Sequence, residues 1–310
     1  MPREPDSALA ALVAALEPTL ALLDVRSLPG GVSTDMRLVR LRDRSGAVVK
    51  RVLRRASPES PATRWDALRV EFTLLAALSD QGLPVPRPIA IDESERLGAG
   101  PSLWLDYVEG APDFRPADPR AFARRLAELM ARIHKAELSP SLRRRMPDGH
   151  RTELERITRA RTGGSRPECR PILAALEADP IPPPARPVLI HGDLWLGNLI
   201  WREGEPVAVI DWEDACLGDP LDDIAVARLD LLWALGSEAM HAFTVAVMAG
   251  RGVSDRRRAL HDLRAGLRAA GNLAEWSAGW AGFGRPDVTE PSMTAGHERF
   301  VRAALAKLES

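Results

Sequence analysis

The sequence predicts an α+β chain with a small, strand-rich N-lobe and a larger, mainly helical C-lobe. In the first part of the chain, short apolar runs separated by turn signals are typical of strands. Beyond Asp118, apolar residues recur at helix spacing instead. A segment rich in Pro and Asp, residues 111–119, separates the two patterns. We therefore expect an N-lobe over residues 1–110 and a C-lobe over residues 111–310.

The N-lobe is expected to begin with a helix and three antiparallel strands. Asp6–Leu16 has the apolar content of an amphipathic helix and a capping residue at its start. Alternation of apolar and polar residues predicts the strands, and a Gly-rich turn joins the first two. The three strands are predicted at Asp24–Leu28, Met36–Leu41 and Val48–Leu53.

One more helix and one more strand complete the predicted N-lobe. Leu68, Phe72 and Leu75 fall on one face of a helix over Trp65–Leu78. The prolines that follow Gly82 keep the chain extended, because proline disfavours helix at and before its own position. Ser102–Val108 is then an apolar strand.

The C-lobe is expected to be mostly helical. Phe122, Leu126 and Met130 form an apolar stripe on a helix that runs from Asp118 through Ala136. The basic segment Arg143–Arg166 is predicted to be exposed and irregular, and Pro180–Pro187 to be a stiff spacer. Four further helices are predicted at Leu221–Leu235, Ser237–Ala249, Asp255–Trp280 and Glu290–Leu308.

Composition excludes several classes of function. The chain has 42 Lys and Arg against 43 Asp and Glu, so charge gives no case for binding nucleic acid or an anionic membrane. Cys169 and Cys216 offer neither a disulfide framework nor a CxxC metal spacing. No run is long enough to span a bilayer, and the N-terminus does not read as a signal peptide. We expect a soluble cytoplasmic protein whose oligomeric state the sequence does not indicate.

The segment from Val188 to Ala225 carries the chemistry. His191, Asp193, Asn198 and Asp211 lie within it, and the apolar runs Val188–Ile190 and Val207–Ile210 predict short buried strands. An Asp, an Asn five residues later and a second Asp after a strand form the layout of a phosphoryl-transfer site. Asp193 can take a proton from an acceptor hydroxyl. Asn198 and Asp211 can hold Mg²⁺, which prefers hard oxygen ligands and takes only one or two from the protein.

At these residues the chain resembles the aminoglycoside phosphotransferase and choline kinase-like enzymes, which share the protein-kinase fold. The shared pattern is His191-Gly192-Asp193, then Asn198, then Ile210-Asp211-Trp212, and it continues into Gly218-Asp219-Pro220. The resemblance extends from about Leu28 to Ala225. It implies a protein-kinase-like two-lobe fold, a nucleotide cofactor that is ATP or GTP, and Mg²⁺.

The resemblance also implies a nucleotide site in the N-lobe. The turn with Gly30, Gly31 and Ser33 corresponds to the loop that covers the phosphates, since glycine lets backbone N–H groups approach closely. The family places a cation after Val52-Leu53, where this chain has Arg54. Lys50, four residues earlier on the same strand face, remains the alternative.

Two further parts of the nucleotide site follow from the resemblance. Glu71, in the helix after the third strand, is expected to orient the phosphate-binding cation. The run 105–110 resembles the family's hinge, so the carbonyl of Asp106 and the N–H of Val108 are expected to face the adenine edge.

The predicted function is an ATP-dependent transfer of a phosphoryl group to a hydroxyl of a small molecule, such as an antibiotic, a sugar or another metabolite. A non-catalytic nucleotide-binding protein with a kinase fold is the alternative, and the intact Asp193, Asn198 and Asp211 argue against it. A protein kinase ranks lower, because no activation segment follows Asp211. The helix Asp255–Trp280 begins with a run of arginines, so a neutral acceptor fits it at least as well as a polycationic aminoglycoside.

Overall fold

The computed structural model describes residues 7–28, 34–56, 62–94, 97, 101–163 and 166–309. Its contacts divide the chain into two compact units. The N-terminal unit contains Met1–Glu109 and Leu138–Arg145, and the C-terminal unit contains Gly110–Glu137 and Met146–Ser310. The short segment Leu138–Arg145 therefore groups with the N-terminal residues, although it lies beyond the boundary expected from the sequence.

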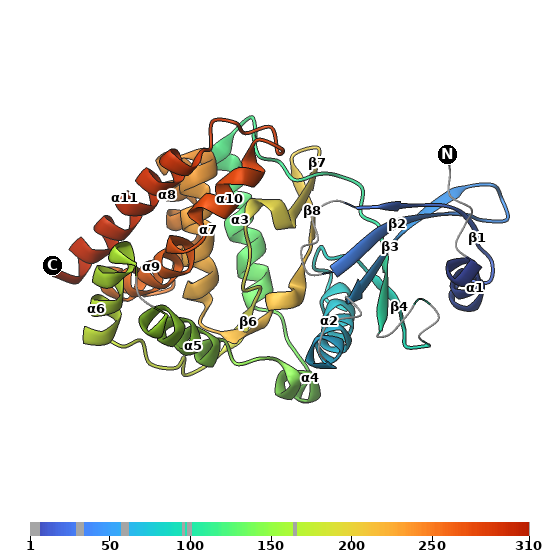
Figure 1. Cartoon of the computed structure of the whole chain (residues 1–310), viewed down its shortest axis with the longest axis horizontal. Coiled ribbons are helices and arrows are strands. Elements are labelled where there is room, and N and C mark those ends of the chain that lie inside the picture. The colour runs from blue at the N-terminus through green and yellow to red at the C-terminus, as the bar shows by residue number, and fades with distance from the viewer. Residues whose placement is uncertain are drawn as a thin grey trace. The chain divides into compact units, whose positions relative to one another are not determined.

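The N-terminal unit is built on a five-stranded antiparallel sheet, whose strand order is β1-β2-β3-β5-β4 (Figure 1). The three strands predicted first are present and pair in the expected antiparallel sense, and the strand predicted from Ser102 forms β5. The bounds are β1 Ala21–Ser27, β2 Thr34–Arg42, β3 Val48–Ala56, β4 Pro88–Asp92 and β5 Ser102–Asp106.

In the described part of this unit, the sheet is accompanied by helices α1 Ser7–Leu16, α2 Ala62–Asp80 and α4 Pro140–Arg145. Leu9, Leu12 and Val13 of α1 are buried in one apolar cluster with Leu53 of β3 and Trp104 of β5. Full burial of each such side chain is worth about 1.5–3 kcal/mol. The cluster fixes α1 to the sheet, so that β3 lies in the middle of a packed layer.

The C-terminal unit is mainly helical, and α7 (Pro220–Leu235) lies at its centre. Helix α7 packs against α3 (Pro119–His134), α8 (Ser237–Met248), α9 (Asp255–Ala270) and α11 (Glu290–Glu309) (Figure 1). Its side chains are buried on nearly all sides, as expected for a central helix. The unit also contains α5 Gly149–Thr162, α6 Arg170–Ala178 and α10 Leu273–Trp280.

Two predictions about helices in this unit were wrong. The segment Arg143–Arg166 is not irregular, because most of it forms α5, which Asp148 caps by accepting from the N–H of Arg151 at 3.2 Å. Arginine is a good helix former, so a helix with few apolar residues can still form there. The predicted helix Asp255–Trp280 is two helices, and the chain breaks between them at Gly271 and Asn272.

Short strands complete the described part of the C-terminal unit. Strand β6 (Val188–Ile190) pairs with β9 (Cys216–Gly218), and β7 (Leu199–Arg202) pairs with β8 (Glu205–Val209). The two strands predicted within the segment from Val188 to Ala225 therefore exist, but they belong to different sheets. Among the described residues, no helix combines the length and apolar character that crossing a bilayer requires.

Candidate active site

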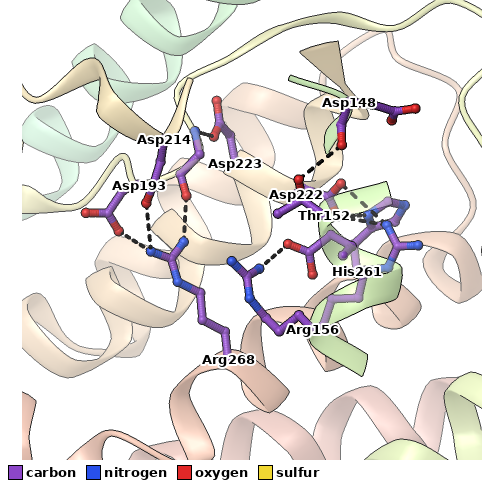
Figure 2. Close-up of polar contacts among 12 residues, drawn as sticks. Asp148, Thr152, Arg156, Asp193, Asp214, Asp222, Asp223, His261 and Arg268 are labelled. Atoms are coloured by element: carbon purple, nitrogen blue, oxygen red, sulfur yellow. Dashed lines mark hydrogen bonds and ion pairs between the residues drawn. The ribbon is translucent and has the colours of Figure 1, made fainter. Parts of the chain in front are cut away.

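One buried carboxylate binds the first two backbone N–H groups of the loop that follows β6. Asp223, on α7, accepts from the backbone N–H of His191 at 2.9 Å and from that of Gly192 at 2.8 Å. His134, the last residue of α3, contacts the same carboxylate through Nε2 at 3.0 Å. Burial opposes the ionisation of Asp223, but the hydrogen bond and charge of His134 and the contacts with His191 outweigh it, so its pKa lies below the ordinary value. The loop is thus fixed to α7 (Figure 2).

Only glycine fits at the second position of this loop. Gly192 has φ of 82°, and a Cβ there would lie 2.4 Å from the carbonyl oxygen of Asp214. The left-handed backbone and the close approach to another backbone both exclude a side chain. The glycine of the His191-Gly192-Asp193 pattern (HGD) is therefore required for steric reasons. The backbone turn at this glycine determines the direction of the Asp193 side chain.

The Asp193 side chain is half-buried, and both of its oxygens accept hydrogen bonds. Oδ1 contacts Arg268 Nη2 at 2.6 Å, and Oδ2 contacts Asn198 Nδ2 at 3.3 Å. The same Asn198 nitrogen donates to the Asp193 carbonyl at 2.9 Å. The predicted base is therefore held in one orientation by two side chains.

Asn198 and Asp211 lie at the same end of the β7–β8 hairpin. Asn198 directly precedes β7, Asp211 follows β8 by two residues, and the N–H of Ile210 donates to the Asn198 carbonyl at 2.9 Å. His191 is fully buried and contacts the Ile210 carbonyl through Nε2 at 3.0 Å. The hairpin end and the Asp193 loop are therefore joined through His191.

The donor set at this end of the hairpin fits Mg²⁺. The Asn198 nitrogen faces two acceptors on Asp193, so the amide oxygen is the atom that can meet a cation. Asp211 is exposed and has a left-handed backbone, with φ of 64°. That conformation is uncommon outside glycine and is found where the surroundings enforce it. No cluster of three or more His, Cys, Asp or Glu arranged for a metal occurs in the described part of the chain, and Mg²⁺ does not need one.

In the N-terminal unit, Arg54 and Glu71 form a buried ion pair between β3 and α2. Arg54 is 4% exposed and Glu71 5% exposed. Lys50 differs, because its side chain is 36% exposed, contacts Glu109 at 2.6 Å and lies over the Tyr107 ring. Of the two candidate cations, Arg54 is the one that a helix Glu orients. Binding of phosphate by either remains a prediction.

The predicted hinge follows β5. The N–H of Asp106 donates to the Arg87 carbonyl at 2.9 Å, and its carboxylate pairs with Arg51 and Arg87. Val108 lies two residues past the end of β5. Adenine binding by this stretch remains a prediction. Gly30, Gly31 and Ser33, predicted to cover the phosphates, lie outside the described residues.

Sequence reasoning missed two side chains near Asp193. Arg268, on α9, stands 75 residues away in the chain, so no local motif connects the two. Asp230, on α7, has its pKa raised to about 8 by burial and by the charge of Asp193, which the opposite charge of Arg268 only partly offsets. The sequence signal for Asp230 was an acidic residue between Leu229 and Leu231, in an otherwise apolar stretch of a predicted helix.

The comparison with known families is decisive for the type of protein. The model of the phosphotransferase enzyme family matches residues 24–264. The chain belongs to this family. Its fold is protein-kinase-like, as in the solved aminoglycoside phosphotransferases.

Two of the curated proteins that match this chain differ in kind. The first is acyl-CoA dehydrogenase family member 10 of Mus musculus, 28% identical over 64% of this chain but only 20% of that protein. The second is viomycin phosphotransferase of Streptomyces vinaceus, 29% identical over 68% of this chain and 79% of that enzyme. The chain thus spans about a fifth of one relative and most of the other.

Solved structures share the fold over nearly the whole length. The GDP complex of aminoglycoside 2′-phosphotransferase-IIIa aligns with a TM-score of 0.63, at 20% identity, over 99% of this chain and 98% of that one. Spectinomycin phosphotransferase, in complex with ADP and spectinomycin, aligns with a TM-score of 0.60, at 12% identity, over 99% of both chains. At these identities the likeness establishes the fold alone.

Proposed function

We propose that this phosphotransferase moves the γ-phosphoryl group of ATP to a hydroxyl of a small molecule, with Asp193 as the base. The observation that carries the proposal is the setting of Asp193. Its carboxylate is fixed from both sides, on a loop tied to α7, beside the Asn198–Asp211 pair. Positioning supplies most of the catalysis in phosphoryl transfer, because the transition state is loose. A rigidly held carboxylate fits that requirement.

In this reaction the acceptor hydroxyl forms a bond to the γ-phosphorus while the bond to the bridging oxygen of ADP breaks. Asp193 positions the hydroxyl and accepts its proton. Asn198 and Asp211 would hold Mg²⁺, which neutralises charge on the phosphates when bound. Arg54, kept in place by Glu71, would contact the nucleotide phosphates with a guanidinium that stays charged.

The nucleotide is proposed by analogy with the structural neighbours, whose complexes hold GDP and ADP. The family resemblance favours ATP, with GTP as the alternative. Asp106 and Val108 would offer backbone groups to the base. Gly30, Gly31 and Ser33 would cover the phosphates.

We propose a neutral acceptor with an apolar ring face. Trp195, two residues after Asp193, belongs to an aromatic cluster with Phe114, Trp280 and Phe283, in which Phe114 and Phe283 stack with their ring centroids 4.8 Å apart. Phe283 is 47% exposed and can meet a ligand ring. Arg268, which pairs with Asp193, would repel a polycation.

An ADP-formation screen with Mg²⁺-ATP tests this function. The panel contains viomycin, kanamycin, spectinomycin, a macrolide, simple sugars and a hydroxyacyl thioester, the last because one relative is named for acyl-CoA chemistry. We expect acceptor-dependent ADP release by the parent and almost none by Asp193→Asn. ATP binding in a thermal-shift assay without turnover on any acceptor would instead favour the non-catalytic alternative.

A further inference from the structure

We propose that Arg268 is a positioning residue for Asp193, acting through that carboxylate and not on the nucleotide. The inference rests on the proposed function, since it takes Asp193 to be the base. Arg268 lies on α9, outside the HGD loop and the β7–β8 hairpin.

The guanidinium of Arg268 contacts the loop at two points. Nη2 meets Asp193 Oδ1 at 2.6 Å, and Nη1 donates to the Gly192 carbonyl at 2.5 Å. Asp214 lies farther away, at 3.8 Å. Because the guanidinium is planar and its donors are fixed relative to one another, the contact with the Gly192 carbonyl orients the guanidinium on the loop, and the contact with Oδ1 then places that carboxylate oxygen (Figure 2).

Arg268 is itself held firmly. Its side chain is 17% exposed, and the residues on either side of it in α9, Leu267 and Ala269, are buried. Burial lowers the pKa of Arg268, but the charges of Asp193 and Asp214, with those of other nearby carboxylates, raise it above its ordinary value. A permanent charge on a packed helix therefore lies against the base.

The geometry leaves Asp193 able to act. A carboxylate offers about four lone-pair sites. Arg268 uses one on Oδ1 and Asn198 one on Oδ2, so each oxygen can still accept from an acceptor hydroxyl. The two donors remove the rotational freedom of the carboxylate without blocking it. A misplacement of about 1 Å at a reacting group can cost about 10²-fold in rate.

A neighbouring arginine provides a matched control. Arg156 and Arg268 line the same small polar cavity, which encloses about 60 Å³. Arg156 pairs with Glu153 and not with Asp193. Its loss removes an equal charge from the same cavity without touching the base.

The experiment measures ADP release from Mg²⁺-ATP with water as the acceptor, so no unidentified substrate is needed. We expect Arg268→Gln to lower kcat by about 10²-fold with the KM for ATP within about twofold, because the lost interaction acts on the chemical step. Arg156→Gln should stay close to the parent. Guanidinium ion added to Arg268→Gln should restore part of the rate, which a general loss of structure would not allow.

A double mutant separates this assignment from a structural role. If Arg268 acts through Asp193, Arg268→Gln should have no further effect in Asp193→Asn protein. Full additivity, or normal turnover by Arg268→Gln, would overturn the assignment while leaving Asp193 as the base. If Asp193→Asn hydrolysed ATP at the same rate as the parent, Asp193 would not be the base, and the role of Arg268 would fall with it.

A conservative variant covers the case in which Arg268→Gln does not fold. Arg268→Lys keeps the charge but loses the two-point contact. We expect it to fold and to lose about tenfold in kcat, an intermediate effect for a retained charge with poorer alignment. A parent-like kcat for Arg268→Lys would show that charge alone suffices and that no orientation is imposed.

Discussion

Asp193 is the residue on which the proposed chemistry depends most directly. Asp193→Asn keeps the size of the side chain and the contact of Asn198 with the carbonyl of residue 193, and removes the proton acceptor. We expect turnover to fall by about 10²–10⁴-fold, the usual worth of a positioned base. Mg²⁺-ATP affinity, measured by calorimetry, should change little. Near-normal turnover on an acceptor found by the screen would remove Asp193 from the mechanism.

Asp230 gives a prediction about pH at the same scale. Its pKa is about 8 in the folded protein and 3.8 in the ordinary reference state. Between these values the unfolded chain releases a proton that the folded protein keeps. Stability from this group is therefore complete below pH 3.8 and is lost as pH rises to about 8.

Asp230→Asn should remove this dependence. The melting temperature of the variant relative to the parent, measured in scans at each pH, should rise between pH 5 and about pH 8 and level off above that. Asp66→Asn, at an exposed carboxylate, is the control and should show no such trend. A constant offset for Asp230→Asn would mean that Asp230 ionises normally in the folded protein.

At the scale of the element, strand β3 carries both candidates for the phosphate-binding cation. Arg54 is buried against Glu71, whereas Lys50 pairs with Glu109 near the surface. Arg54→Ala should raise the KM for ATP and lower turnover, while Lys50→Ala should have a mild effect. Glu71→Ala should resemble Arg54→Ala, and the double mutant should be less than additive, because the two residues act as a unit. The reverse ranking in steady-state kinetics would move the phosphate contact to Lys50.

Elements differed in how far the sequence could predict them. Strands β1, β2 and β3 show alternation, so their existence and antiparallel pairing could be predicted. The sequence predicted β5 as a strand without a partner and the β4 segment only as extended chain, because the long connections between these strands do not reveal how they pair. Helix α5 could not, since its sequence is basic with few apolar residues and its helical state depends on capping and arginine content. The break between α9 and α10 depends on Gly271, which the apolar pattern alone does not reveal.

In the candidate site, too, the sequence predicts the residues that lie close together in the chain better than those brought together by packing. Asp193, Asn198 and Asp211 stand in one short motif, and local spacing was enough to bring them together. Arg268 reaches the loop only because α9 packs against α7, so its contact is a property of the tertiary fold. Arg54 and Glu71 are intermediate, since the ion pair joins two adjacent elements and the family pattern anticipated it.

For the whole molecule, the binding of Mg²⁺ and ATP should raise the melting temperature, and the increase caused by ATP should depend on Mg²⁺. Asp211→Ala should weaken Mg²⁺-dependent binding of ATP strongly, and Asn198→Ala less, because water replaces an amide oxygen more easily than a carboxylate. A ligand at 100 times its Kd stabilises the folded state by about 2.7 kcal/mol, so the shift in melting temperature is measurable.

The control is Glu205→Ala, which removes an acid from the opposite end of the β7–β8 hairpin. It should keep the full Mg²⁺-dependent shift with ATP. If Asp211→Ala and Asn198→Ala also kept the parent's Mg²⁺ dependence, the ligand assignment would be wrong.

The carboxylate of Asp223 has a consequence for the motions of the loop. The amide protons of His191 and Gly192 are bound by a buried group on the central helix, not by a neighbouring strand. They can exchange with solvent only when α7 and the loop separate. In deuterium oxide these two amides should therefore exchange as slowly as the amides of α7 itself, at rates set by large-scale opening of the helical unit. On the timescale of turnover, the loop that contains Asp193 would then move no more than the core of the helical unit.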